Sequence, residues 1–238
     1  MSAPLLSIQN ISAGYDGRDV LRGVSIDVTE GQFCAVIGPN GHGKTTVMRA
    51  ICGLIPARSG KVVFDGQDIT GLDPASRRGL GIAMVPQGDM LFPDMSVREN
   101  LLLGAHIERD TARIGRKLDT IHEIFPVLGN RADQLAYTLS GGERRMLAIG
   151  RALAADSKLL IVDEPSLGLS PKIVDEVYAA LSGLGSLGVT VLLVEENVSR
   201  ASDFADVLYL IDQGDVVWSG ASDDVESSSD ILATYLGA

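Results

Sequence analysis

The stretch FCAVIGPNGHGKTT, residues 33–46, decides how this chain folds. Its first five residues are apolar or small and indicate a short buried strand, and the residues from Lys44 onward follow a helical pattern. The glycine-rich segment between them joins the two elements through a tight loop. A strand, a glycine loop and a helix in this order predict one β-loop-α unit of an α/β domain.

The same loop predicts a site for nucleotide phosphates. Residues 38–45 match the pattern G-x-x-x-x-G-K-[ST], after a strand and at the start of a helix, as the pattern requires. Backbone N–H groups around Asn40, Gly41 and Gly43 are expected to surround the β-phosphate, because glycine lets the backbone approach closely. A chance glycine-rich loop is the alternative, and the flanking elements argue against it.

Three side chains complete the predicted site. Lys44 is expected to bridge the β- and γ-phosphates and so to serve catalysis, and Thr46 to cap the same phosphates. Thr45 is expected to hold Mg²⁺ through its hydroxyl. The predicted ligands are therefore ATP and Mg²⁺.

Polar side chains follow two further predicted strands. Asp163 and Glu164 end the apolar run LLIV, and Gln87 follows the run GIAMVP. At the carboxyl edge of a parallel sheet, Asp163 suits the magnesium shell and Glu164 suits a base that polarises the attacking water. The amide of Gln87 can reach the metal or that water. In the alternatives, the acidic pair caps the helix near Pro171 and Gln87 only serves a turn.

Tyr15 precedes the second strand of an N-terminal hairpin that is predicted to turn at Asp16 and Gly17. In this position an aromatic ring can stack on the adenine of a bound nucleotide. Packing within the hairpin is the alternative, and the sequence leaves both open.

A second glycine-containing helix start lies in LSGGERRMLAIGRAL, residues 139–153. Ser140 and Glu143 form a Ser-x-x-Glu capping box, which by itself explains a helix start. Gly141 and Gly142 also let a phosphate approach the bare N–H groups, and the two arginines behind them add positive potential. A single nucleotide needs only one cradle, so the purpose of a second one is an open question at this point.

The rest of the chain alternates between strands and helices. The runs LLIV and VTVLLV predict buried strands, residues 171–187 predict a helix, and a hairpin and a short final helix are expected near the C-terminus. Residues 88–155 are mainly helical, beginning with a second capping box at Ser96 and Glu99. We therefore expect a single domain, with a core at 1–87 and 156–238 and an inserted helical sub-lobe at 88–155.

Composition limits the function classes. The 238 residues carry a formal net charge of −11, which would repel a phosphate backbone, so no nucleic-acid partner is expected. Cys34 and Cys52 lack metal-ligand spacing and are expected to be buried reduced thiols. The densest apolar runs are too short to span a bilayer, so any membrane role is expected to come through a partner.

In order along the chain, GPNGHGKTT, VPQG, LSGGE, LLIVDEPSLGLSP and a strand that ends VEEN resemble the ATP-binding subunits of ABC transporters. The resemblance covers nearly the whole chain. It implies a P-loop ATPase core with a mainly parallel sheet, an N-terminal antiparallel β element and an inserted helical sub-lobe. It also implies a head-to-tail dimer in which LSGGE of one subunit closes over the ATP of the other. This accounts for the second cradle.

Within that family, VPQGDMLFPDMSVRENLLLGA, LSGGERRMLAIGRAL and EPSLGLSP are similar to the ATPase subunits of branched-chain amino acid importers, and urea importer subunits look much alike. The resemblance implies a second ATPase subunit, with a homodimer possible in isolation, and transmembrane permeases. It implies a periplasmic or lipoprotein solute-binding protein as an indirect partner. The expected location is peripheral, on the cytoplasmic face of the inner or plasma membrane.

One position departs from the family pattern. Most relatives end the last core strand with a histidine that contacts the γ-phosphate, and here the register puts Glu196 at that position. A glutamate near phosphate is unfavourable unless it is protonated, turned away or paired with a metal. The isolated chain is therefore expected to hydrolyse ATP slowly. A nucleotide-dependent interaction module with little turnover is the alternative function, and the retained Glu164 argues against it.

The segment GDMLFPDM, residues 88–95, is expected to expose Met90, Leu91 and Phe92. In relatives this surface receives a short cytoplasmic helix of the permease. A local hydrophobic core is the alternative.

Overall fold

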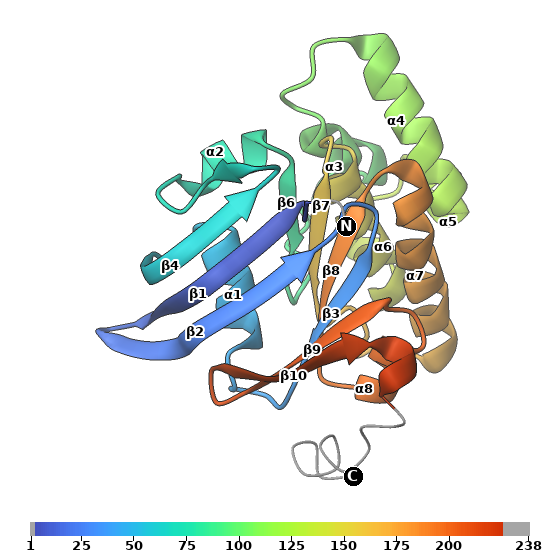
Figure 1. Ribbon diagram of the computed structural model, residues 1–238. Coiled ribbons are helices and arrows are strands. Elements are labelled where there is room, and N and C mark those ends of the chain that lie inside the picture. The colour runs from blue at the N-terminus through green and yellow to red at the C-terminus, as the bar shows by residue number, and fades with distance from the viewer. Residues whose placement is uncertain (1–2, 226–238) are drawn as a thin grey trace.

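The computed structural model describes residues 3–225, and the predicted final helix falls outside them (Figure 1). Its larger sheet has the strand order β10-β9-β3-β8-β7-β6, in which only the pair β9–β10 is antiparallel. This confirms the predicted parallel sheet and the C-terminal hairpin. The strands are β3 (Phe33–Ile37), β6 (Ile82–Val85), β7 (Leu159–Asp163), β8 (Thr190–Glu195), β9 (Val207–Asp212) and β10 (Asp215–Ala221).

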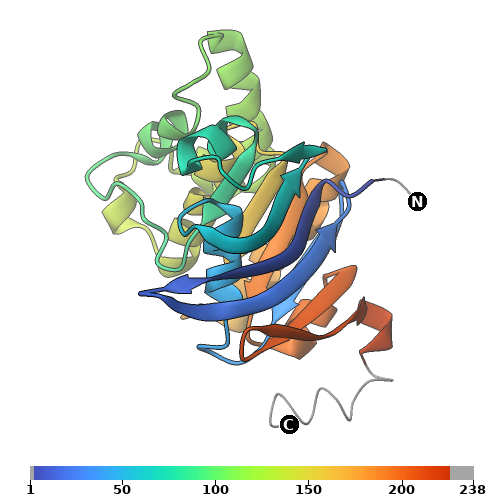
Figure 2. The ribbon, with the colours of Figure 1, turned by 60° about the vertical axis from the view of Figure 1, so that its left-hand side comes forward.

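A second, antiparallel sheet has the order β2-β1-β4-β5 and carries the N-terminal hairpin (Figure 2). Asp16 and Gly17 both have positive φ, 47° and 81°, which suits a tight turn between strands that twist to the right. The predicted turn is thus confirmed. The strands are β1 (Leu6–Tyr15), β2 (Arg18–Val28), β4 (Ala57–Phe64) and β5 (Gln67–Asp68).

Helices cover both faces of the parallel sheet. They are α1 (Lys44–Ile51), α2 (Pro74–Gly79), α3 (Val97–Gly104), α4 (Thr111–Ile124), α5 (Pro126–Asn130), α6 (Gly141–Leu153), α7 (Pro171–Gly183) and α8 (Val198–Ser202). The predicted helix over 171–187 is too long, because α7 ends at Gly183 and the next four residues form a 3₁₀ turn, η2 (Leu184–Leu187). Two further 3₁₀ turns are η1 (Ala136–Thr138) and η3 (Ser222–Asp224).

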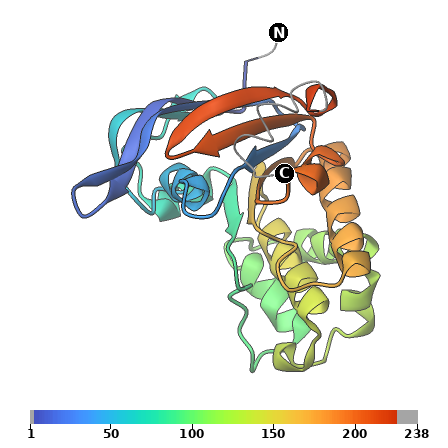
Figure 3. The same cartoon turned by 90° about the horizontal axis from the view of Figure 1, so that it is seen from below.

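Two hydrophobic cores lie on opposite faces of the parallel sheet. Alternate residues of β3 enter different cores: Cys34 and Val36 pack with α1 and the antiparallel sheet, and Phe33, Ala35 and Ile37 pack with the helices of the other face. Figure 3 shows α1 between the two sheets and the longer helices on the far side. The parallel strands are buried on both faces, as their unbroken apolar runs predict.

Candidate nucleotide-binding site

The carboxyl ends of four neighbouring strands meet at one edge of the parallel sheet. Ile37 is paired with Glu195, Asp163 with Val194, and Val85 with Val162. The residues that follow these strand ends therefore start from one edge, although they are far apart in sequence. This edge is where α/β proteins bind their ligands.

The phosphate loop leads directly into α1. Gly43 is the residue before the helix and has φ 114°, a left-handed conformation that a residue with a side chain rarely adopts. Gly41 is exposed, Thr45 is partly exposed and Thr46 is buried. Among residues 3–225, no side chain caps the N-terminus of α1, so its first N–H groups can bind another partner.

Lys44 is 4% exposed and its ammonium folds back over the loop. Nζ donates to the carbonyl oxygens of Gly38 (2.7 Å) and Pro39 (3.2 Å) and to Oδ1 of Asn40 (3.3 Å). Burial lowers the pKa of Lys44, and four nearby carboxylates, Glu164 foremost, oppose that shift. The structure thus places this charge inside the loop that is predicted to hold the phosphates.

Asp163 and Glu164 lie beside this loop. Asp163 is 5% exposed, and burial, followed by the charge of Glu164, raises its pKa to about 6. Glu164 has φ +44°, a strained conformation for a residue with a side chain. Its carboxylate accepts a hydrogen bond from Nε2 of Gln87 (3.1 Å) and lies 3.8 Å from Nζ of Lys44. The three predicted catalytic residues are therefore brought together.

The surroundings of Asp163 fit a cation. Its Oδ1 is buried and has no hydrogen-bond partner among residues 3–225. Within the same residues, no group of three or more His, Cys, Asp or Glu side chains could hold a metal by itself. Mg²⁺ commonly binds to one or two carboxylates together with substrate phosphates, and a single orphaned carboxylate suits that mode.

The two acidic residues at the end of β8 lie in different environments. Glu195 is buried, whereas Glu196 is exposed and its Oε2 accepts a hydrogen bond from Nδ2 of Asn40 in the phosphate loop (2.8 Å). Of the two, only Glu196 contacts the phosphate loop through its side chain, and its place opposite the γ-phosphate stays a prediction.

Tyr15 lies at the end of β1 and is 37% exposed. Its hydroxyl accepts a hydrogen bond from Nη1 of Arg49 on α1 (3.0 Å), and the Arg49 guanidinium carbon lies 5.9 Å from the ring centroid. The ring therefore has a packing partner and an accessible surface, and its stacking on adenine stays a prediction.

At the start of α6, Ser140 is the N-cap and both halves of the capping box form. Gly142 also has a packing role, because a Cβ there would lie 2.3 Å from Cγ2 of Ile173. A Cβ on Gly141 would meet only an ordinary contact, 3.4 Å from Leu169. Of the two glycines, Gly142 is required by the lack of room for a Cβ, whereas Gly141 is not. No hydrogen bond or ion pair among residues 3–225 joins this helix start to the phosphate loop.

The prediction that two arginines add positive potential to this helix start is wrong for Arg145. That side chain is buried, and its Nε lies 3.1 Å from Oδ1 of Asp89, because successive helix positions point to different faces. Arg144 turns back to the helix start, where Nη1 donates to the carbonyl of Leu139 (2.7 Å).

Two features of the site have no counterpart in the predictions. Nδ1 of His42, in the phosphate loop, lies 2.6 Å from Oδ1 of Asp212 at the end of β9. The buried Glu195 accepts four hydrogen bonds, two of them from Ser166 and Tyr178. For the buried Glu195, the sequence offers one signal, a pair of acidic residues at the end of an apolar strand.

Comparisons with known proteins agree with this geometry. A family model described as ABC transporter matches residues 21–167, more than half of the chain. The chain is 37% identical over 234 residues to the high-affinity branched-chain amino acid transport ATP-binding protein of Pseudomonas aeruginosa, a match that covers 98% of this chain and 100% of that protein. It is 34% identical over 235 residues to the lipopolysaccharide export system ATP-binding protein of Haemophilus influenzae, covering 98% and 97%.

Among solved structures, the chain resembles an ATP-binding cassette of an ABC transporter in its ADP conformation. The TM-score is 0.88 at 30% sequence identity, and the match covers 100% of both chains.

Proposed function

The chain belongs to the ABC transporter family, and from that membership we propose that it is the ATP-hydrolysing subunit of an importer for branched-chain amino acids. As an ABC ATPase it binds ATP and hydrolyses it to drive transport. One observation carries the choice of substrate: the match to the Pseudomonas branched-chain amino acid protein is complete over that protein's length. The match to the lipopolysaccharide export protein is somewhat lower in identity and keeps an exporter as the competing function.

In the proposed mechanism, the phosphate loop and Thr46 hold the β- and γ-phosphates and Lys44 neutralises their charge. Glu164 accepts a proton from the attacking water and Gln87 orients that water. The contacts of Glu164 with Gln87 (3.1 Å) and Lys44 (3.8 Å) support these roles. Thr45, Gln87 and Asp163 would hold Mg²⁺, which supplies charge neutralisation at the phosphate oxygens.

We further propose that the start of α6 serves the nucleotide of a second ATPase subunit. Ser140, Gly141, Gly142 and Glu143 would meet that nucleotide from across a head-to-tail dimer. The lack of any described bond between these residues and the chain's own phosphate loop is consistent with this role. The second subunit is proposed to differ from this one, with a homodimer forming in isolation.

Permease docking is proposed for a groove between β6 and the helices α3 and α6. A cavity of 370 Å³ there is lined by Phe92, Leu103 and Arg151 among others. Met90 and Phe92 are 69% and 51% exposed, as predicted, whereas the expectation for Leu91 is wrong because it is partly buried against the core. Arg151 holds the segment by donating to the Met90 carbonyl (2.7 Å).

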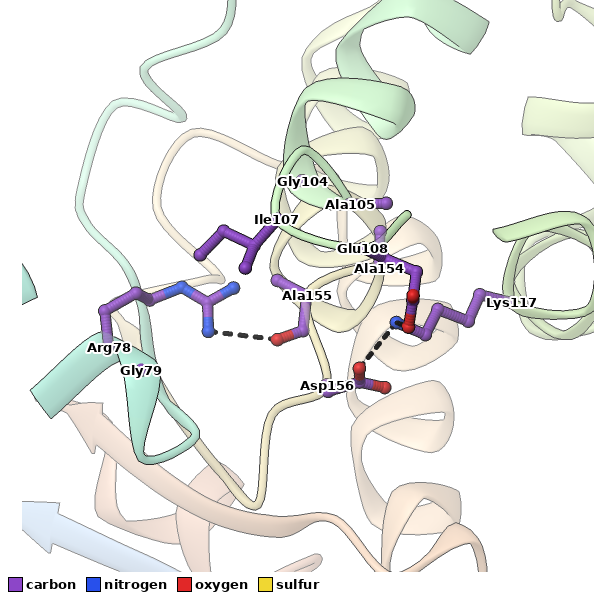
Figure 4. Close-up of a pocket in the computed structure, with 10 residues that line it drawn as sticks. All are labelled: Arg78, Gly79, Gly104, Ala105, Ile107, Glu108, Lys117, Ala154, Ala155 and Asp156. Atoms are coloured by element: carbon purple, nitrogen blue, oxygen red, sulfur yellow. Dashed lines mark hydrogen bonds and ion pairs between the residues drawn. The ribbon is translucent and has the colours of Figure 1, made fainter. Parts of the chain in front are cut away.

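A second cavity, of 190 Å³, continues this groove, since Arg78 and Gly104 line both. Figure 4 shows Lys117 and Asp156 facing each other across its far end, where they form an ion pair of 2.7 Å. Ile107 also lines this cavity and is 66% exposed. Exposed apolar side chains with a charged rim suit a short amphipathic helix of a partner.

No helix within residues 3–225 is long and apolar enough to cross a membrane. We therefore propose that the permease holds this subunit at the cytoplasmic face of the membrane. We also propose the division into a core, at 1–87 and 156–238, and a helical sub-lobe at 88–155.

The docking proposal is tested with Phe92→Asp. Since Phe92 is half exposed, the variant should fold and bind ATP normally but lose solute transport in the assembled complex. Leu187→Asp is the matched control, because Leu187 is 52% exposed on η2, outside the groove, and should keep transport. Loss of folding in Phe92→Asp would instead support the local-core alternative.

The substrate proposal is tested in proteoliposomes that contain the complex encoded with this chain. Leucine bound to the cognate solute-binding protein should stimulate ATP hydrolysis. Stimulation by urea and not by leucine would move the assignment to a urea importer, and stimulation by lipopolysaccharide would move it to an exporter. A chain that binds ATP but releases no phosphate even with its partner would be an interaction module.

A further inference from the structure

Glu195 is a buried carboxylate that the proposed mechanism does not use. It is the last residue of β8 and is 3% exposed. No ion pair with Glu195 occurs in the part of the chain that the structure describes. A buried charge without a cation is costly unless hydrogen bonds compensate for its lost hydration.

Four donors compensate this carboxylate, two at each oxygen. Oε2 accepts from Oγ of Ser166 (2.9 Å) and from the hydroxyl of Tyr178, and Oε1 accepts from the backbone N–H groups of Glu196 (2.9 Å) and Asn197 (3.2 Å). Burial raises the pKa of Tyr178, and the charge of Glu195 raises it further, so the tyrosine remains a donor. One side chain therefore joins the segment that contains Ser166 to the turn after β8, and Tyr178 of α7 is a further donor to it.

Both segments adjoin groups that surround the phosphate loop. Ser166 lies two residues after Glu164, and Glu196 bonds to Asn40 of the loop (2.8 Å). Glu164, Ser166, Glu195 and Glu196 all line one cavity of 350 Å³. The contacts form a continuous chain from the phosphate loop, through the two glutamates, to the segment behind Glu164.

We propose that Glu195 is a positioning residue that fixes the backbone behind Glu164 to the turn that carries Glu196. Because all four hydrogen bonds converge on one buried group, neither segment can move without leaving a donor or the carboxylate unpaired. A change in the Glu196 contact on arrival of the γ-phosphate is thereby transmitted to the segment behind Glu164. This inference rests on the proposed roles of Glu164 and Glu196.

The test removes the hydrogen bond between Ser166 and Glu195 and then restores it. Ser166→Ala should lower kcat about tenfold while KM for MgATP stays within about twofold, because Glu164 is displaced but the phosphate loop is not. Ser166→Thr keeps the hydroxyl and should restore most of kcat. Ser182→Ala is the matched control, since the Ser182 hydroxyl bonds only to backbone carbonyls of its own helix, and it should behave as wild type.

A double-mutant cycle identifies the contact. Glu195→Leu removes the acceptor oxygens and should lower kcat, and combining it with Ser166→Ala should add little, because both variants break the same bond. If Glu195→Leu does not fold, the Ser166 series decides. Wild-type kcat in Ser166→Ala, or no restoration by threonine, would overturn the inference. Glu164→Gln distinguishes failure of the proposed mechanism from failure of this inference. If Glu164→Gln is active, Glu164 is not the catalytic base. If Glu164→Gln is inactive and Ser166→Ala is fully active, only the positioning role of Glu195 is refuted.

Discussion

Two helices of this molecule begin next to glycines, and their N-termini differ. The start of α1 follows Gly43 and has no side-chain cap, whereas the start of α6 is closed by Ser140 and Glu143 of its own sequence. The N–H groups at the start of α1 can therefore still bind a ligand. At the start of α6, the capping box pairs N–H groups within the chain itself.

The charges around the two starts differ in the same way. Near α1, Lys44 bonds to loop carbonyls and Asp163 has an unpaired oxygen. Near α6, Glu143 accepts from the N–H of Ser140 and pairs with Arg131 (3.1 Å). The start of α1 is therefore the one of the two at which we expect the chain to bind a ligand by itself.

The largest expected effect separates the two helix starts. Lys44→Ala should weaken ATP binding by the isolated chain more than about 100-fold, because the glycine N–H groups alone cannot offset the β- and γ-phosphate charge. Ser140→Ala should leave that affinity unchanged, although it should lower the free energy of unfolding by about 1 kcal/mol through the lost cap. Calorimetric titration and thermal melts measure both.

Lys158→Ala controls for the loss of a lysine, because the Lys158 ammonium forms an exposed ion pair with Asp65. Unchanged ATP affinity in Lys44→Ala would defeat the phosphate-site assignment. Weakened affinity in Ser140→Ala would show that α6 contributes to the chain's own site, contrary to the comparison.

The next effect concerns the two glycines of α6. Gly142→Ala should lower the free energy of unfolding by about 2 kcal/mol, because the added Cβ overlaps Cγ2 of Ile173. Gly141→Ala should change it by less than about 0.5 kcal/mol. Chemical denaturation measures both, and adding Ile173→Ala should relieve part of the Gly142→Ala loss. A stable Gly142→Ala with reduced turnover would show that Gly142 serves the ligand instead.

A pH dependence sharpens the contrast in charge. The pKa of Asp163 is raised to about 6 in the folded chain, above its unfolded value, so folding is favoured by protonation and stability is lost as pH rises through 6. Asp163→Asn should therefore match wild type near pH 4 and become more stable by up to about 3 kcal/mol at pH 8. Melts of ligand-free protein at each pH decide the matter.

The smallest effect probes the border of the phosphate loop. Because Glu196 bonds to Asn40 of the phosphate loop, we propose that its carboxylate faces the negative charge that develops on the phosphate. Glu196→His should then raise turnover of the isolated chain about tenfold. Glu196→Gln should lie between the two. The measurement is phosphate release at saturating MgATP, with nucleotide affinity determined separately. Equal rates in all three proteins would mean that Glu196 does not act on the reaction.

Much of the molecule follows from local patterns. The hairpin turn at Asp16 and Gly17, the capping boxes at Ser96 and Ser140, and the strand-loop-helix unit around Lys44 each depend on a few neighbouring residues. The end of β8 next to Glu196 also follows from the sequence, because a strand end is marked by where its apolar run stops.

Other features depend on which faces meet in the folded chain. Arg145 turns inward to Asp89, Gly142 makes room for Ile173, and Leu91 joins the core, although nothing beside these residues in sequence indicates it. The helix 171–187 ended early for a similar reason, since η2 and the following turn bring the chain back to β8.

By itself, the sequence determined the strand-loop-helix unit, the family motifs and the identity of the residues at the sheet edge, because each is encoded within a few positions. Only the tertiary structure decided that Glu195 is buried and holds Ser166, that Asp163 keeps an unpaired oxygen, and that His42 meets Asp212. The physical reason is that burial and hydrogen-bond partners are set by segments distant in the chain, and a side chain's charge and bonding become defined only when those segments pack around it.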